Sequence, residues 1–391
     1  MAHRKIILSP LLFLLLTSIV AGPSVVARAS STDDPGAICT FAAMMETPDL
    51  CPVAGPAPAR AEYWRIGLLP RQPLPAIPLD PDLKKLDRWY AVVSKDRVLS
   101  SYASIDDALA NRSQRQLGPG FVWISYIDVV ERDDDLFLMT GDWKDYVRRE
   151  DVSPKDYIAG QFGGFTLAET PTRPFGWIVE YQGIYPSRTP GGKPDPKAPL
   201  YRGYDPVEVF DSQDVNGTTW FLVGVNQWIE QKKVGLVFPT AELPEGVPVG
   251  DKWISVNLFE QTLAAYEGNR LVFATLTATG LPGWWTRPGL FTIDYKFELD
   301  TMQGAFEADR ADFYYVAEVP WVMYFDRARA IHGEYWHNTL GFKRSHGCVN
   351  IPVADAHWLF DWAPKGTYVW VFDPSDKTPK DAASYANDAG I

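Results

Sequence analysis

A cysteine surrounded by histidines is the part of this sequence best suited to catalysis. Residues 344–350 read Arg-Ser-His-Gly-Cys-Val-Asn, and the pair His332-Gly333 lies upstream. The chain has five histidines, and four of them fall close to the cysteine: His332, His337, His346 and His357. A thiol attacks well only as a thiolate, and histidine titrates nearest to neutral pH. The cluster therefore indicates nucleophilic catalysis by Cys348 with a histidine as base.

The backbone around Cys348 adds to this interpretation. His332 and His346 are the candidate bases. Gly347 permits a tight turn, and the backbone N–H groups of Gly347 and Cys348 are candidates for an oxyanion hole. Pro352 suits the start of a helix, whose positive end would face the cysteine. A thiol with a base and an oxyanion hole predicts acyl transfer through a thioester.

The other two cysteines predict a structural role. Cys39 and Cys51 are close in sequence, and in an oxidising compartment we expect them to form a disulfide worth about 3 kcal/mol. The N-terminus supports such a compartment, because a basic start, an apolar run and an Ala-x-Ala site at residues 27–29 are typical of a cleaved secretory signal. We therefore expect a secreted, cell-envelope protein without a membrane span once the signal is removed. The alternative is that the segment is retained as a membrane anchor.

Composition favours a mainly β chain of several domains. The sequence has 391 residues with 30 Gly and 32 Pro, typical of short strands joined by turns. The formal charge of −12 argues against nonspecific nucleic-acid binding. We expect these segments: signal 1–29, Pro-rich linker 30–86, β modules 87–158 and 170–242, catalytic domain 251–373 and polar tail 374–391.

The two β modules are inferred from a weak internal repeat. Apolar runs precede Trp143 in the first module and Trp228 in the second, and Asn216-Gly217 is a strong hairpin signal. The modules resemble small bacterial SH3-like β-barrels. The alternative is one irregular β domain.

The cysteine segment itself resembles a known family. His332-Gly333 followed by Ser-His-Gly-Cys-Val-Asn at 345–350 is similar to the signature of the L,D-transpeptidase catalytic domain. The likeness extends over residues 251–373 and includes glycine turns at 277–280 and 286–291. Arg287 and the insertion 282–285 depart from the family pattern. The resemblance implies a β-sandwich with a short helix after the catalytic loop.

The resemblance also implies roles for individual residues. Cys348 is the nucleophile, and His332 is the general base, oriented by a backbone carbonyl near Gly333. Ser345 and His346 shape the pocket, and His346 supports the oxyanion. Substrate contacts are expected from two further residues: Asn350 and Tyr324.

The implied substrate is a peptidoglycan stem tetrapeptide in the cell wall. Cys348 would attack the carbonyl of its third residue, a diamino acid, and release the terminal D-Ala. An amine of a second stem would then complete a 3→3 cross-link. Such enzymes are also acylated by carbapenems, and the resemblance implies neither a metal nor an organic cofactor.

Four alternatives stay open at this point. Water in place of the amine would make the protein an L,D-carboxypeptidase, and a decayed catalytic domain would leave a non-catalytic wall-binding protein. A zinc site would use His332, His346, Cys348 and one further histidine, although no paired metal-ligand spacing supports it. A papain-like peptidase is disfavoured, because there the cysteine precedes the histidine.

Overall fold

The structure is a computed structural model that describes residues 75–239, 242–305, 307, 310–381 and 385. The expected signal segment 1–29 and the expected Cys39–Cys51 disulfide lie outside the described residues. Within them the chain is mainly β, as predicted, with the short helices α3 (Ile105–Leu109) and α4 (Val353–Trp362). No helix in the described part of the chain is both long and apolar enough to cross a membrane.

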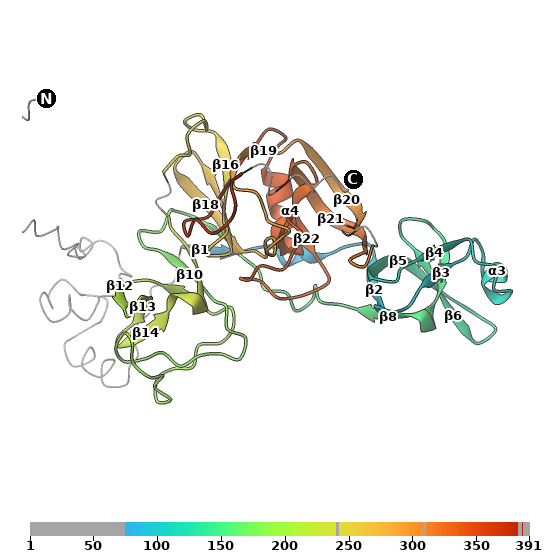
Figure 1. Ribbon diagram of the computed structural model, residues 1–391, viewed down its shortest axis with the longest axis horizontal. Helices are drawn as coiled ribbons and strands as arrows, with labels where there is room; N and C mark the ends of the chain where they lie inside the picture. The colour runs from blue at the N-terminus through green and yellow to red at the C-terminus, as the bar shows by residue number, and fades with distance from the viewer. Residues whose placement is uncertain (1–74, 240–241, 306, 308–309, 382–384, 386–391) are drawn as a thin grey trace, which may run out of the picture.

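The first β region, residues 89–155, lies at one end of the molecule (Figure 1). Its long strand β5 (Phe121–Arg132) pairs with β2 (Trp89–Val93) and with β6 (Asp135–Thr140). The remaining strands are β3 (Leu99–Ser101), β4 (Arg115–Leu117), β7 (Tyr146–Arg148) and β8 (Val152–Lys155). Alternate apolar residues of these strands form one buried core that includes Ile124 and Leu138.

The second β region, residues 175–237, packs as two three-stranded sheets. The predicted Asn216-Gly217 hairpin is confirmed, because both residues have positive φ and join β12 to β13. The strands are β10 (Phe175–Ile178), β11 (Pro206–Glu208), β12 (Asp211–Val215), β13 (Thr218–Gly224), β14 (Gln227–Glu230) and β15 (Val234–Val237).

The C-terminal region is built on two sheets around α4. The first has seven strands, ordered β1-β9-β18-β17-β16-β24-β19. Its members are β1 (Ala76–Pro78), β9 (Phe165–Leu167), β16 (Lys252–Asn257), β17 (Thr262–Glu267), β18 (Arg270–Leu276), β19 (Gly289–Thr292) and β24 (Tyr368–Phe372). The largest apolar core lies between this sheet and α4, and includes Ile254, Phe273 and Leu359.

Two strands of that sheet come from segments that were expected to lie outside the catalytic domain. β1 falls within the expected linker 30–86, and β9 falls between the two expected modules. β9 pairs with both β1 and β18, so these segments extend the edge of the C-terminal sheet. Each strand is only three residues long, so its tertiary partner rather than its own sequence decides its structure.

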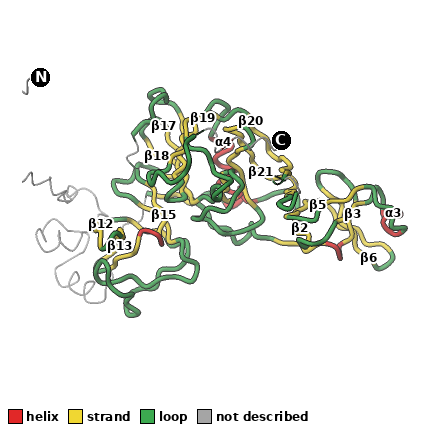
Figure 2. The backbone as a smooth tube through the Cα atoms, viewed as in Figure 1, coloured by secondary structure: helices red, strands yellow, loops and turns green. Residues whose placement is uncertain are grey.

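The second C-terminal sheet continues into the first β region. It holds β20 (Tyr295–Gly304), β21 (Tyr314–Asp326), β22 (Arg329–Glu334) and β23 (Val349–Pro352). β21 pairs in parallel with β5, so one nine-stranded sheet runs from the cysteine segment into the first β region. Figure 2 shows these strands following one another across the molecule.

Candidate active site

The two sequence elements of the site are brought together by a parallel strand pair. His332 lies on β22 and Asn350 on β23, and the two residues are directly opposite in the register. Cys348 comes just before β23 begins. Strand pairing therefore places the cysteine segment beside His332, although neither local pattern alone requires this.

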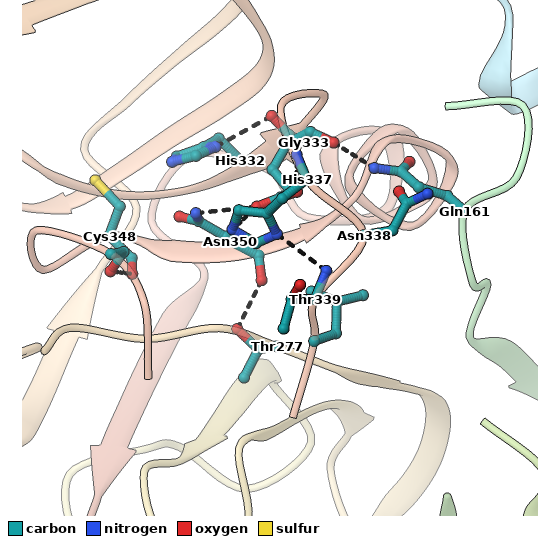
Figure 3. A network of polar contacts seen from close by, with 12 residues as sticks. Gln161, Thr277, His332, Gly333, His337, Asn338, Thr339, Cys348 and Asn350 are labelled. Atoms are coloured by element: carbon teal, nitrogen blue, oxygen red, sulfur yellow. Dashed lines mark hydrogen bonds and ion pairs between the residues drawn. The ribbon is translucent and has the colours of Figure 1, made fainter. Parts of the chain in front are cut away.

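His332 is held as a neutral base. Its side chain is buried, and burial lowers the pKa of the imidazole to about 4. Nδ1 lies 3.1 Å from the carbonyl oxygen of Gly333. A carbonyl oxygen only accepts hydrogen bonds, so Nδ1 carries the proton and Nε2 is the basic nitrogen. In Figure 3 that other ring nitrogen faces the sulfur of Cys348.

Cys348 is a half-buried free thiol. Burial raises the pKa of this thiol above its ordinary value. The sulfur lies 3.7 Å from the carbonyl oxygen of Ala328, to which the thiol proton is directed. Burial therefore favours the neutral forms of both the thiol and the imidazole, and an imidazole in the same cavity is suited to accept a thiol proton.

Hydrogen bonds within the cysteine loop (residues 344–348) fix its shape. The hydroxyl of Ser345 donates to the Cys348 carbonyl at 2.5 Å, and the Gly347 N–H donates to the same hydroxyl at 3.1 Å. Gly347 has φ of +118°, a conformation that favours glycine. The Gly347 N–H already donates to the Ser345 hydroxyl. Of the two backbone donors predicted for an oxyanion hole, the N–H of Cys348 is therefore the better suited to bind an oxyanion.

The side chain of His346 lies between two aromatic rings. It takes no part in the two hydrogen bonds of the cysteine loop described above. Its ring centroid is 4.4 Å from that of Trp284 and 5.4 Å from that of Tyr314, with the Tyr314 ring nearly parallel. Burial lowers the pKa of His346, which favours its neutral form. Trp284 belongs to the insertion 282–285, and here it packs against His346, which lines the pocket.

A buried polar network, which the sequence did not predict, lies behind the site. The side chain of Glu334 is completely buried, and Asn350 Nδ2 donates to it at 3.3 Å. His337 Nε2 lies 2.6 Å from the same carboxyl group, and its Nδ1 accepts from the Thr339 N–H. Burial raises the pKa of Glu334 well above its ordinary value. The network, drawn in Figure 3, orients Asn350 from behind.

The two expected substrate-contact residues are placed differently. Asn350 lines the pocket around Cys348, but only 3% of it is exposed, and its amide is turned toward Glu334. Tyr324 lies on β21, and its hydroxyl donates to Asp300 at 2.7 Å. Tyr324 does not line this pocket.

Arg329 is a further residue that sequence reasoning missed. It is buried beside the cysteine loop, where it pairs with Asp326 at 3.0 Å and donates to the Trp285 carbonyl at 3.0 Å. Its positive charge acts to lower the pKa of Cys348, against the larger effect of burial. Tyr385 of the expected polar tail is buried, and its ring centroid lies 5.0 Å from the Arg329 guanidinium.

The site opens into a cavity of about 390 Å³. Cys348, His332, Ser345 and His346 all line it, together with residues of the first β region. Among the described residues, no group of three or more His, Cys, Asp or Glu side chains is arranged to hold a metal ion. A thiol, a neutral imidazole and a polar loop in one cavity suit cysteine-based acyl transfer.

Comparison with known families agrees with this class of site. The family model YkuD, the L,D-transpeptidase catalytic domain, matches residues 251–371. This part of the chain is therefore an L,D-transpeptidase catalytic domain, as the cysteine motif predicted. Among curated proteins, none matches the chain.

Solved structures similar to this chain include several L,D-transpeptidases. The enzyme from Stackebrandtia nassauensis is 26% identical over 34% of this chain and 58% of its own, with a TM-score of 0.27. The C442S mutant from Enterococcus faecium is 29% identical over 32% and 50%, with a TM-score of 0.29. The chain thus spans little more than half of these relatives, and the family model carries the assignment.

Proposed function

We propose that this protein is a peptidoglycan L,D-transpeptidase of the cell envelope that forms 3→3 cross-links. The observation that carries the proposal is that Cys348 shares one cavity with a buried His332 whose Nδ1 lies 3.1 Å from the Gly333 carbonyl oxygen. This arrangement leaves one basic nitrogen for the thiol within an L,D-transpeptidase catalytic domain. The expected partners are stem peptides of the cell wall.

The first half-reaction is acylation of Cys348. His332 Nε2 takes the thiol proton while the sulfur attacks the carbonyl carbon of the third stem residue. The carbonyl oxygen becomes an oxyanion, which a backbone N–H stabilises. The carbon–nitrogen bond to the terminal D-Ala then breaks, and the imidazolium returns its proton to the leaving amine. A thioester on Cys348 remains.

The second half-reaction transfers the acyl group. A side-chain amine of another stem attacks the thioester and loses a proton to His332. The new amide bond forms as the carbon–sulfur bond breaks, and the proton passes to the sulfur. No step needs a metal or an organic cofactor, because charge is carried by the thiol, the imidazole and the amine.

The alternative acceptor is water, which would give an L,D-carboxypeptidase. The two activities share acylation and differ only in the group that attacks the thioester. Purified tetrapeptide muropeptides separate them, because both reactions release D-Ala but only transpeptidation gives dimers. Release with dimers supports the proposal, whereas release without dimers supports the carboxypeptidase. The absence of release would favour a non-catalytic wall-binding protein.

A further inference from the structure

The first β region forms part of the wall of the Cys348 cavity. Lys95, Gly120 and Phe121 line the cavity together with residues of the cysteine loop. These three residues lie more than 200 positions before Cys348 in the sequence, and the parallel pairing of β5 with β21 brings them there. The cavity is therefore completed by a region outside the matched catalytic domain.

Backbone contacts hold this wall in place. The Phe121 N–H donates to the Phe313 carbonyl at 2.9 Å. Gly120 has φ of +145°, and a Cβ atom there would lie only 2.2 Å from the same carbonyl oxygen. The close approach therefore requires glycine. The Gly120 N–H also donates to the Lys95 carbonyl at 2.9 Å, which ties the Lys95 turn to the junction.

Lys95 lines two cavities, only one of which contains Cys348. A second cavity adjoins the first and shares Lys95, Gly120 and Phe313 with it. The second cavity is lined by the first β region and by residues 310–313, and no residue of the cysteine loop lines it. Lys95 therefore lies where the cavity that contains Cys348 meets the second cavity along the first β region.

The charge of Lys95 is available to a ligand. Its side chain is exposed, and within the described ranges no ion pair or hydrogen bond involves its ammonium group. Arg329, another cation of the cavity wall, is by contrast paired with Asp326. Arg344 and Asp312 are the other charged side chains among the lining residues. An ammonium at the rim of a cavity in an acidic chain favours an anionic group on the ligand.

We propose that Lys95 binds a carboxylate of the acyl-donor stem, on the residue that precedes the diamino acid. This inference rests on the proposed function. The terminal D-Ala is bonded to the attacked carbonyl, so its own carboxylate stays near Cys348. Residues on the other side of that carbonyl extend away by about 3.5 Å each, and the depression toward Lys95 can receive them. The first β region would thus select stems whose carboxyl is free rather than amidated.

The test compares two synthetic donor tetrapeptides that differ only in a carboxylate or an amide at that residue. Acyl-enzyme formation is followed by mass spectrometry on the full chain without an acceptor. We expect the wild-type protein to prefer the acid by about fivefold, as for a partly exposed ion pair, with the difference in the peptide concentration that half-saturates acylation rather than in the limiting acylation rate. The preference should vanish in Lys95→Met and reverse in Lys95→Glu.

Lys144→Met is the matched control, because Lys144 is an exposed lysine of the same β region that lines neither cavity. It should keep the wild-type preference. An equal preference in Lys95→Met and wild type, or none in wild type, would overturn the assignment of Lys95. If neither peptide acylates the wild-type protein, the proposed function itself fails, which is a distinct outcome.

Discussion

The Nδ1 atom of His332 lies 3.1 Å from the carbonyl oxygen of Gly333, its own neighbour in the chain. A backbone carbonyl thus does the orienting that a carboxylate performs in many catalytic triads. Unlike a carboxylate, it adds no full negative charge that would stabilise the imidazolium. Burial lowers the pKa of His332 to about 4 although the hydrogen bond to Gly333 acts to raise it, so the imidazole is neutral near pH 7.

Replacing the base should be far more damaging than replacing a packing histidine. His332→Gln removes Nε2 as proton acceptor and should slow acylation by roughly a hundredfold or more. His357 instead stacks on Trp321 with centroids 3.7 Å apart, and its Nδ1 lies 3.2 Å from the Leu83 carbonyl. His357→Gln should therefore change acylation little. Rates of acyl-enzyme formation measure both variants, and equal losses would mean that His332 is not the base.

The rate of acylation should fall only at low pH. The imidazole of His332 is the proton acceptor only when neutral, and its pKa is lowered to about 4 by burial. The neutral form is therefore present above that pH, and activity should be lost as pH falls through about 4. Initial acylation rates in buffers from pH 3.5 to 8 test this. A limb centred near 6.5 would indicate an exposed histidine as base.

Thr286 should be needed to hold the cysteine loop. Its buried hydroxyl donates to the Gly347 carbonyl at 2.8 Å and accepts from the Gly280 N–H at 2.9 Å. Thr286→Val leaves both backbone groups unsatisfied and should cost about 1–3 kcal/mol of stability, with slower acylation. Denaturant unfolding and acylation rates measure the two effects.

The matched control for Thr286 is Thr292→Val. Thr292 is partly exposed, and its hydroxyl donates to the Asp294 carboxylate at 3.2 Å without touching the cysteine loop. Its change in unfolding free energy should stay within about 0.5 kcal/mol, with an unaltered acylation rate. Similar behaviour of the two variants would show that the Thr286 bridge does not hold the loop.

Glu260 should make stability fall as pH rises. Burial raises the pKa of this carboxyl to about 7 in the folded protein, against 4.5 ordinarily. Between these values the folded state binds more protons than the unfolded state, so the free energy of unfolding decreases with pH. The full effect is on the order of 3 kcal/mol.

Glu260→Gln tests this contribution, because an amide of nearly the same shape does not titrate. Urea unfolding at pH 5 and at pH 7.5 should show a smaller loss of stability in the variant than in wild type. Burial also raises the pKa of Asp355 to about 7. Its contribution to the loss of stability with pH is therefore present in both proteins. If the free energy of unfolding falls between pH 5 and pH 7.5 by the same amount in Glu260→Gln as in wild type, Glu260 is not a source of the pH dependence.

The sequence predicted the family of the catalytic domain better than the architecture of the chain. Cys348 and His332 could be chosen because few residue types attack carbonyls or move protons near neutral pH, and their motif is specific. The Asn216-Gly217 hairpin was predictable for a similar reason, since its turn requires positive φ at both residues. Such local requirements can be read directly from the order of residues.

Features that depend on distant strand pairing were not predictable in this way. Gly120 resembles any turn glycine until β5 is placed beside β21, where it meets the Phe313 carbonyl. Glu334 lies two residues after His332 and resembles any charged residue in the sequence, and only the fold buries it beside Asn350. The cavity wall at Lys95 and the polar network behind the site therefore follow from tertiary structure alone.

The central claim is that Cys348 forms the covalent intermediate. Intact mass after exposure to a carbapenem tests it most directly, because a β-lactam carbonyl acylates a thiol as a stem peptide would. We predict that the wild-type mass rises by one drug equivalent and that Cys348→Ala, which keeps the fold but lacks the thiol, shows no adduct. The same mass increase in Cys348→Ala would contradict the account.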